Sequence, residues 1–372
     1  MPDRAPMPEP LSLPGRLTVD LGAIADNWRR LRAMGSAECG AVVKADAYGL
    51  GVARVAPALA AAGCRSFFVA FLAEGMELRA ILGAGPRIFV LCADRRDDPA
   101  AYAAHALIPV ISSREHFERW AARGVLEGLP FLVQADTGMH RLGVAPREAR
   151  SLLEQPGCLG LMSHLACADE PGHDLNARQL ACFREIAGRA PHLPILSLAN
   201  SCGIALGPDW QFTLTRPGIA LYGGNPTPGG PNPMRPVVTL EAPILQLLEV
   251  EAGETVGYGA TFTARHPSRI AILPLGYADG VLRHLSNSGE AVVAGRRVPY
   301  AGRVSMDMLA LDVTDVPPAH LADDAVARII GPELTVDEVA AAAGTIAYEL
   351  LTRLGPRLER TVPGGGQTAA GT

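Results

Sequence analysis

The stretch Ala41-Val42-Val43-Lys44-Ala45-Asp46-Ala47-Tyr48-Gly49-Leu50-Gly51 carries the most information about the fold. Val42 and Val43 are apolar and β-branched, which is typical of the end of a buried strand. The small residues, tyrosine and glycines that follow predict a tight loop. Burying the Lys44 ammonium is costly unless the amine is bonded or neutralised, and a Schiff base with a carbonyl cofactor would neutralise it. A surface lysine just past a strand is the alternative.

Length, composition and charge limit the class of protein. A chain of 372 residues predicts a large domain with a smaller one. The hydrophobic fraction of 48% and charged fraction of 19% are typical of a globular protein. A net charge of −5 gives no electrostatic argument for nucleic acid. No apolar run approaches the roughly 20 residues of a membrane helix, so no membrane partner is expected.

Cysteine usage and the ends of the chain give further expectations. The seven cysteines are scattered without a C-x-x-C pair, which favours reduced thiols and a cytoplasmic protein. Residues 1–14 are rich in proline and lack the apolar core of a secretory signal, so we expect a mobile tail. Residues 363–372 are rich in glycine and threonine and predict a disordered tail.

Strand-like and helix-like windows alternate through residues 15–236. The strand windows are 16–19, 39–43, 66–70, 88–91, 108–111, 131–135, 159–163, 195–199 and 219–222, and the helical windows are 21–33, 51–62, 72–82, 113–122, 146–153, 177–190 and 201–206. About eight βα units with apolar, non-alternating strands predict a parallel sheet covered on both faces. The length suits a (β/α)8 barrel, which is usually about 250 residues long.

A doubly wound open sheet would give a similar local pattern. The positions of the polar residues favour the barrel, because they lie at or just after strand ends, where barrel enzymes carry their chemistry. These residues are Lys44, Gln134, Arg141, His164, Asn200, Ser201 and Arg216.

The pattern changes after residues 223–236, whose prolines and glycines indicate a linker. Short strand windows then follow at 237–250, 271–274, 290–293, 297–301, 308–312 and 327–330, and only 336–343 and 346–354 are helical in pattern. We therefore expect an α/β protein: a (β/α)8 barrel over 15–236 followed by a mostly β domain over 237–362.

Several polar residues after strand ends have chemical uses of their own. The fork of Arg141 can bond a phenolate or a carboxylate. Ser201 opens a predicted helix and Gly218 allows close backbone approach, and both features suit a phosphate. Each residue also has a plain structural alternative: a surface arginine, or an ordinary serine and glycine after a strand. His164, taken alone, is more often a hydrogen-bonded core histidine than a catalyst.

The stretch around Lys44 resembles the pyridoxal-phosphate attachment segment of alanine racemases, with Asp46 and Leu50 where asparagine and histidine are more usual. Further strings similar to that family follow in its order: D-T-G-M-H-R-L-G (136–143), S-H-L-A (163–166), R-P-G-I-A-L-Y-G (216–223), V-G-Y-G-A-T-F (256–262), G-Y-A-D-G (276–280), G-R-V-S-M-D (302–307) and I-A-Y-E-L (346–350). The resemblance runs from about residue 16 to 360.

This resemblance implies a cytoplasmic, homodimeric alanine racemase that interconverts L- and D-alanine through an external aldimine of pyridoxal 5'-phosphate. It implies Lys44 and Tyr258 as the two catalytic bases, with Tyr258 reaching the active site of the other subunit. It implies no metal. The other cofactor-binding residues would be Tyr48, His164, Ser201, Arg216, Gly218, Ile219 and Tyr348, and the substrate-binding residues Arg141, Met306 and Tyr277, with Asp307 in support.

The implied partner of the pyridine nitrogen has a chemical consequence. Arginine stays protonated, so a ring nitrogen facing Arg216 should stay unprotonated and be a poorer electron sink. A carbanion that is not widely delocalised is reprotonated quickly, which suits racemisation. Inverting an α-carbon needs proton donors on opposite faces, and Lys44 can serve only one of them.

Two positions depart from the family pattern. Gln134 stands where many members carry a lysine that holds the arginine at the Arg141 position, and Ser305 replaces a common cysteine. A serine or broad-specificity racemase and a non-catalytic pyridoxal-phosphate-binding protein stay open as alternatives. The second domain with Tyr258 argues against the latter. A decarboxylase is less favoured, since an acid rather than Arg216 would face its ring nitrogen.

Overall fold

The computed structural model describes residues 14–363 except 125, 127, 323 and 324. The chain divides into two compact units. The barrel unit is Leu21–Val237, and the β unit comprises the described parts of Met1–Asp20 and Val238–Thr372. Apart from Pro14 and Pro363, the two predicted tails lie outside the described residues.

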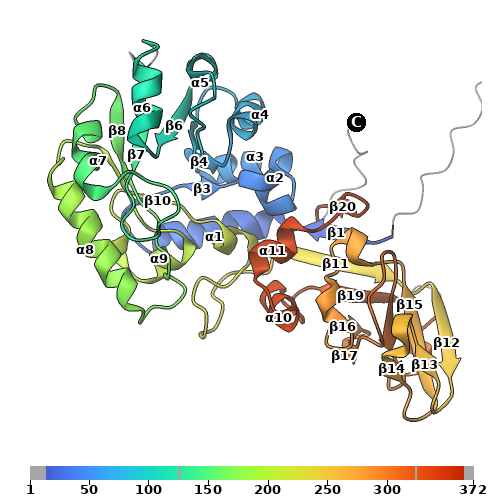
Figure 1. Ribbon diagram of the computed structural model, residues 1–372. Helices are drawn as coiled ribbons and strands as arrows, with labels where there is room; N and C mark the ends of the chain where they lie inside the picture. Colours follow the sequence, from blue (N-terminus) through green and yellow to red (C-terminus); the bar gives the residue numbers. More distant parts are fainter. Residues whose placement is uncertain (1–13, 125, 127, 323–324, 364–372) are drawn as a thin grey trace, which may run out of the picture. The chain divides into compact units, whose positions relative to one another are not determined.

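The barrel unit is built from parallel strands with helices outside them (Figure 1). Its strands are β2 (Glu38–Cys39), β3 (Ala41–Val42), β4 (Ser66–Val69), β5 (Arg87–Val90), β6 (Leu107–Ile111), β7 (Phe131–Gln134), β8 (Cys158–Met162), β9 (Ile195–Ser197) and β10 (Leu214–Thr215). Its helices are α1 (Leu21–Ala33), α2 (Lys44–Gly49), α3 (Val52–Ala62), α4 (Leu72–Leu82), α5 (Pro99–Ala104), α6 (Arg114–Ala121), α7 (Pro146–Leu153), α8 (Asp174–Gly188), α9 (Ser201–Ala205) and the 3-10 turns η1 (Pro208–Trp210) and η2 (Ile219–Tyr222).

Backbone hydrogen bonds close this sheet into a barrel. Strands β3 to β9 form one sheet in chain order, and β10 pairs with β2. Arg216 N–H donates to Ala199 O at 2.9 Å, which joins the end of β9 to β10, and Val42 N–H donates to Pro217 O at 2.9 Å on the other side. β2 and β3 act as one barrel strand interrupted at Gly40, where a Cβ atom would lie 2.8 Å from the Phe68 ring. The predicted (β/α)8 barrel is confirmed.

The strands are buried on both faces, as their apolar, non-alternating sequences predict. Every residue of β4 and of β6 is buried. The rings of Phe68 and Phe89 stack with centroids 4.7 Å apart between adjacent strands. This packing makes the barrel wall a rigid support for side chains that follow the strand ends.

The eighth strand lies earlier than the sequence predicts. Residues 219–222 form the 3-10 turn η2, and β10 at Leu214–Thr215 completes the barrel. A four-residue buried apolar run does not distinguish a strand from a helical turn, which explains the wrong prediction. Helix α5 was not predicted at all, although Pro99 at its first position and the Asp98 cap are start signals.

The β unit contains two sheets and a short ribbon. Their strands are β1 (Arg16–Val19), β11 (Val238–Pro243), β12 (Gln246–Val250), β13 (Thr255–Val256), β14 (Phe262–Thr263), β15 (Ser268–Leu273), β16 (Glu290–Val293), β17 (Arg296–Pro299), β18 (Leu309–Asp312), β19 (Val326–Ile330) and β20 (Glu359–Thr361). The sheet orders are β17-β16-β19-β11-β1-β20 and β12-β15-β18, with β13 paired to β14. The unit also holds α10 (Val336–Ala342), α11 (Ala347–Thr352) and the 3-10 turns η3 (Tyr258–Ala260), η4 (Tyr277–Asp279), η5 (Arg283–Leu285) and η6 (Pro318–His320).

Two details differ from the sequence-based picture. The predicted strand 237–250 is divided into β11 and β12 after Pro243, whose ring cannot donate to a ladder. Strand β1, assigned from sequence to the barrel range 15–236, pairs antiparallel with β11 and parallel with β20. Its partners therefore lie in the β unit.

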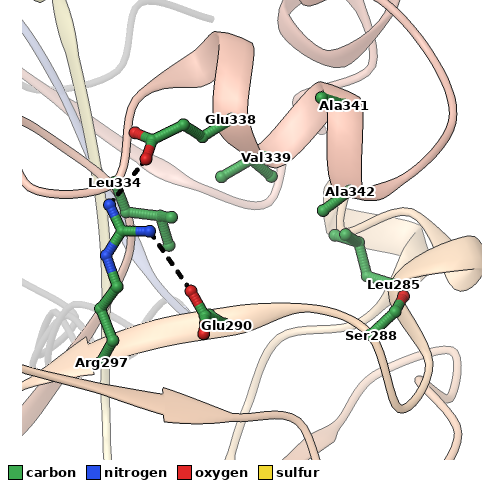
Figure 2. A pocket seen from close by; sticks show the side chains of 9 residues that line it. All are labelled: Leu285, Ser288, Glu290, Arg297, Leu334, Glu338, Val339, Ala341 and Ala342. Carbon is green, nitrogen blue, oxygen red and sulfur yellow. Dashed lines mark hydrogen bonds and ion pairs between the residues drawn. The ribbon is translucent and has the colours of Figure 1, made fainter.

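A pocket of about 270 Å³ lies in the β unit (Figure 2). Its lining is largely aliphatic, and its one arginine, Arg297, donates to Glu338 at 2.7 Å and to Glu290 at 3.3 Å. The single arginine of this pocket is thus paired with both of its carboxylates, and the lining includes no residue that the sequence predicts for the active site.

Candidate active site

Lys44 follows β3 after one residue, Val43, and begins an unusual backbone turn. Residues Ala45 to Tyr48 have φ angles of 52°, 53°, 53° and 60°, so the first turn of α2 is left-handed. Such a turn is disfavoured for non-glycine residues and persists only where its surroundings hold it. The loop predicted after the strand is therefore present as this compact turn. The Lys44 side chain forms no hydrogen bond or ion pair with any described residue.

Two carboxylates hold the left-handed turn. Asp46 accepts a hydrogen bond from Val52 N–H at 2.6 Å and so satisfies a backbone donor at the start of α3. Glu74 accepts from Ala45 N–H at 2.8 Å and from Ala70 N–H at 2.6 Å, which ties the turn to the end of β4. Asp46 is thus a working substitute for asparagine, since either side chain offers an oxygen to Val52. The sequence analysis did not identify Glu74.

A backbone cradle lies between Ser201 and Gly218. The Ser201 hydroxyl accepts from Gly218 N–H at 2.9 Å and from Ala220 N–H at 3.3 Å. A Cβ atom on Gly218 would lie 2.3 Å from the Tyr48 hydroxyl, so only glycine leaves room there. Ile219 is buried beside it. The structure therefore brings Tyr48, Ser201, Gly218 and Ile219 together.

Arg216 is buried and held from several sides. It donates to Ser197 Oγ and to Ser163 O, each at 2.5 Å, and its Nη2 lies 3.4 Å from His164 Nδ1. Burial lowers the pKa of Arg216 to about 10, so the guanidinium stays charged at neutral pH. Its Nε–H bonds to no described residue. The Nε–H donor of a fixed, charged fork is thus left for a ligand acceptor.

His164 shows that the predicted cationic residues gather at one place. Its pKa is lowered to about 3, first by burial and then by the positive charges of Arg216, Arg141 and Lys44. His164 is therefore neutral at physiological pH and cannot act as a proton donor there. It can pack its ring against a ligand and accept a hydrogen bond from Arg216.

This cluster fits an anionic aromatic cofactor. Lys44 and Arg141 have no ion-pair partner among the described residues, and the Nε–H of Arg216 bonds to none of them. The three positive groups surround the neutral ring of His164, and the Ser201–Gly218 cradle lies beside Tyr48. Such an arrangement suits a phosphate, a phenolate and a carboxylate. Pyridoxal phosphate with an amino-acid substrate carries these three groups. Among the described residues, no group of histidine, cysteine or carboxylate side chains could hold a metal ion.

The candidate residues of the β unit lie on neighbouring loops. Tyr258, in η3, has 75% of its surface exposed, Tyr277 has 45% and Met306 has 53%. Tyr277 N–H donates to Ser305 O at 3.0 Å, and Ala278 N–H donates to Met306 O at 3.1 Å, so these two loops are bound together. Tyr348 lies on α11. These exposed aromatic and sulfur-containing side chains form a group separate in sequence from the barrel residues.

Comparison with known proteins decides the family. Models described as "Alanine racemase, N-terminal domain" and "Alanine racemase, C-terminal domain" match residues 19–226 and 237–362. The alanine racemase of Rhodospirillum rubrum is 49% identical over 358 residues, covering 94% of this chain and 96% of the relative. The chain belongs to the alanine racemase family.

Relatives and solved structures agree with this family. A catabolic alanine racemase of Agrobacterium fabrum is 47% identical, with 96% of this chain and 95% of the relative covered. The crystal structure of a biosynthetic alanine racemase from Pseudomonas aeruginosa has a TM-score of 0.88 and 38% identity, covering 94% of this chain and 99% of that one. The alanine racemase of Bartonella henselae, solved with covalently bound pyridoxal phosphate, has a TM-score of 0.87 and 37% identity, covering 95% and 100%.

Gln134 holds the arginine loop of this alanine racemase family member by its backbone. Its side-chain amide donates to Leu142 O at 2.8 Å, and Val144 N–H donates to Gln134 O at 2.9 Å. No bond joins Gln134 to the Arg141 guanidinium, which is left without a partner among the described residues. Gln134 therefore holds the backbone of residues 142–144 rather than the guanidinium of Arg141.

Ser305 also closes a turn. Its hydroxyl donates to Met308 O at 2.8 Å and accepts from Met308 N–H at 3.1 Å, with Met306 and Asp307 at the tip. A cysteine would make weaker hydrogen bonds here. Behind this turn, Arg357 bonds both Asp307 and the buried Asp279. The sequence analysis missed Arg357, which stands outside every matched string, and gave Asp279 no role.

Proposed function

We propose that this protein interconverts L-alanine and D-alanine by a two-base mechanism, with Lys44 and Tyr258 as the bases. The reaction class follows from membership of the family: the chain is a pyridoxal-phosphate-dependent isomerase. When bound, pyridoxal phosphate withdraws electrons from the substrate Cα and so makes its proton acidic. The observation that supports the cofactor position best is the cluster of Lys44, Arg141 and Arg216 around neutral His164.

The barrel residues would divide the work of binding. Ser201, Gly218 and Ile219, with Tyr48 and Tyr348, would hold the phosphate. Ser201 supplies a hydroxyl, and the missing side chain of Gly218 lets the Tyr48 hydroxyl lie close to its backbone. Arg216 would donate its free Nε–H to the pyridine nitrogen. Because Arg216 stays charged at neutral pH, it would keep that nitrogen unprotonated. Arg141 and the Met306 backbone would hold the substrate carboxylate, and Tyr277 would form part of the wall.

Inversion at Cα requires a proton acceptor on one face and a donor on the other. Lys44 would serve one face from the end of β3, within the barrel of residues 15–236. Tyr258 would serve the other from the domain of residues 237–362. Neither residue alone can both remove a proton from one face and return it to the opposite face.

We propose that Tyr258 acts in the active site of a partner subunit, so that the active form is a homodimer. The support is the 75% exposure of Tyr258, together with the exposure of Tyr277 and Met306 in the same unit. Large apolar side chains exposed together are typical of an interface. We also propose a cytoplasmic location, since all seven cysteines are unpaired thiols. No helix in the described part of the chain is long and apolar enough to span a membrane.

The direct test is racemisation of L-alanine, L-serine and L-leucine by the purified protein. We expect alanine to react fastest and an absorbance band near about 420 nm that borohydride abolishes. Lys44→Ala should lose both the band and the activity. A protein with the band that turns over serine faster than alanine would contradict the substrate assignment, and one with no turnover would contradict the enzymatic function.

A further inference from the structure

A three-way ion pair lies behind two of the proposed substrate loops. Arg357 donates through Nε to Asp279 Oδ1 at 2.8 Å and through Nη2 to Asp279 Oδ2 at 2.9 Å. Its Nη1 donates to Asp307 Oδ1 at 2.8 Å. One guanidinium therefore uses all three of its nitrogens to bind two carboxylates. Such charge-assisted, two-pronged contacts are short and fixed in direction.

Asp279 is the buried end of this arrangement. Its surface is 0% exposed, and besides Arg357 it accepts from Gly276 N–H at 3.0 Å. A buried carboxylate is tolerated only when it is paired and hydrogen-bonded. Asp279 also accepts at its backbone oxygen from Gly355 N–H at 3.0 Å, which brings the segment of Arg357 alongside. Hydrogen bonding to both carboxylates raises the pKa of Arg357, so its charge is permanent.

The two loops joined by Arg357 are those that carry Tyr277 and Met306. Asp279 ends η4, in which Tyr277 is the first residue, and Asp307 directly follows Met306. The loops are in close contact: a Cβ atom on Gly276 would lie 2.2 Å from Met306 O. Arg357 thus fixes the spacing of these two loops through its bonds to Asp279 and Asp307.

Only one of the two backbone hydrogen-bonding groups of Met306 has a partner among the described residues. Its carbonyl accepts from Ala278 N–H at 3.1 Å, whereas its own N–H bonds to no described residue. The residue is 53% exposed, at the tip of a turn closed by Ser305. A firmly held N–H with no acceptor among the described residues is suited to an anionic acceptor supplied by a ligand.

We propose that Arg357 is a positioning residue for substrate recognition, which fixes the Met306 N–H and Tyr277 through its bonds to Asp307 and Asp279. The proposal rests on the proposed racemase function, because that function gives Met306 a carboxylate to bind. Arg357 does not touch the substrate. Arg357 holds the Met306 N–H in place before the substrate carboxylate binds. Less free energy is then spent on ordering the loop during binding.

The test uses Asp307→Ala, because the Asp307 side chain is 53% exposed and its loss leaves Asp279 paired with Arg357. The KM for L-alanine and the inhibition constant of propionate, which has the carboxylate but no amine, should each rise about tenfold, the effect of losing one charge-assisted hydrogen bond. The kcat and the visible absorbance should stay within about threefold of the parent, since both bases are intact. Asp307→Asn keeps an acceptor oxygen and should show a smaller rise. Arg357→Lys, which cannot bond both carboxylates in this geometry, should show a rise similar to that of Asp307→Ala.

The matched control is Arg297→Gln. Arg297 also joins two carboxylates of the β unit, Glu290 and Glu338, as Figure 2 shows. Its loss should lower the melting temperature without changing the KM or the propionate constant. Unchanged constants in Asp307→Ala, or an equal rise in Arg297→Gln, would overturn the positioning role while the parent protein still racemises alanine. A parent protein without racemase activity would overturn the proposed function and this proposal together.

Discussion

Gly218 lies in the proposed cofactor site at a position with no room for a side chain. A Cβ atom there would lie 2.3 Å from the Tyr48 hydroxyl and 3.1 Å from Cζ of the same ring. Its backbone is not in the left-handed region, so space alone requires the glycine. The Tyr48 ring is itself confined by Tyr222, with ring centroids 4.6 Å apart. An added methyl group must therefore displace a well-packed side chain.

We expect Gly218→Ala to lower the free energy of unfolding by about 1–3 kcal/mol, the usual cost of overpacking, and to weaken cofactor binding at least as strongly. Gly172→Ala is the control, because a Cβ atom there meets nothing within 4 Å. Urea unfolding and cofactor titration of the two variants measure the difference. Equal affinity for the cofactor in both variants would contradict the proposal that Gly218 forms part of the cofactor site.

Two histidines make the stability of the protein sensitive to acid. Burial lowers the pKa of His116 from 6.5 to about 4, and burial with nearby positive charges lowers that of His164 to about 3. As the pH falls below 6.5, the unfolded chain takes up protons that the folded protein cannot. The stabilising contribution of the neutral rings is therefore complete above pH 6.5 and is lost as the pH falls toward 4 and 3.

For His116 the loss between pH 7 and pH 4.5 should be about 2–3 kcal/mol. Its Nε2 atom is buried without a partner, and its ring packs edge-on against Trp120 with centroids 4.4 Å apart. His116→Phe keeps a packed ring without the proton site, so its unfolding free energy should fall less over this interval. His192→Gln, at an exposed position, is the control. An identical pH slope in His116→Phe and the parent would refute this account.

At the level of single residues, the motif strings predicted which residues lie together but not which atoms they bond. The cradle residues Ser201 and Gly218 do lie together, because the strings place them after adjacent strands of a parallel barrel. Gln134 stands where many family members carry a lysine that holds the arginine, yet its amide bonds the Leu142 carbonyl. A sequence does not show which of two nearby acceptors a side chain reaches, since the choice depends on the backbone path.

Among the elements, the left-handed turn of α2 is the most constrained. Four successive non-glycine residues with positive φ follow Lys44. The turn is held by Asp46, which accepts from Val52 N–H, and by Glu74, which accepts from Ala45 N–H. Strain of this kind next to the proposed catalytic lysine is consistent with a turn that sets the direction of its side chain.

We expect Asp46→Ala to destabilise the protein by about 0.5–2 kcal/mol, the usual cost of removing a helix cap, and to reduce cofactor occupancy. Asp46→Asn should be close to neutral, because the amide oxygen can accept from Val52 in the same way. Thermal unfolding and visible absorbance of the two variants make the comparison. A loss of stability in Asp46→Asn as large as in Asp46→Ala would show that the charge, not the hydrogen bond, matters.

Elements with strong hydrophobic periodicity were predicted well, and short ones were not. Helices α1 and α7 have the bounds expected from their amphipathic patterns. The run at 219–222 was predicted as a strand and is a 3-10 turn, because four apolar residues specify burial but not backbone conformation. The left-handed turn could not be predicted, since its tertiary hydrogen bonds overcome the local preference of Ala45 and Asp46.

At the scale of the whole molecule, each proposed active site contains Lys44 of one chain and Tyr258 of another. The sequence predicted the barrel and the β domain from the change in pattern near residue 236. It did not predict that β1, at the other end of the chain, pairs with β11. Pairing between distant strands depends on long-range contacts that no local pattern records.

A shared site predicts complementation. Lys44→Ala and Tyr258→Phe should each abolish racemisation, and their co-expression should restore it. If chains assemble at random, half of the dimers are mixed, and each mixed dimer has one intact site of two, so about a quarter of the parent activity is expected. Mixtures that stay inactive although mixed dimers are isolated with two affinity tags would contradict sharing between subunits.

The most direct measurement of the two-base mechanism is exchange of the α-proton in heavy water, followed by NMR, for each alanine enantiomer with Tyr258→Phe. A base left on one face can remove and return a proton on that face only. We therefore predict exchange into one enantiomer without formation of the other, whereas the parent protein exchanges both and racemises them. Racemisation by Tyr258→Phe at the parent rate, or equal exchange into both enantiomers, would contradict the account.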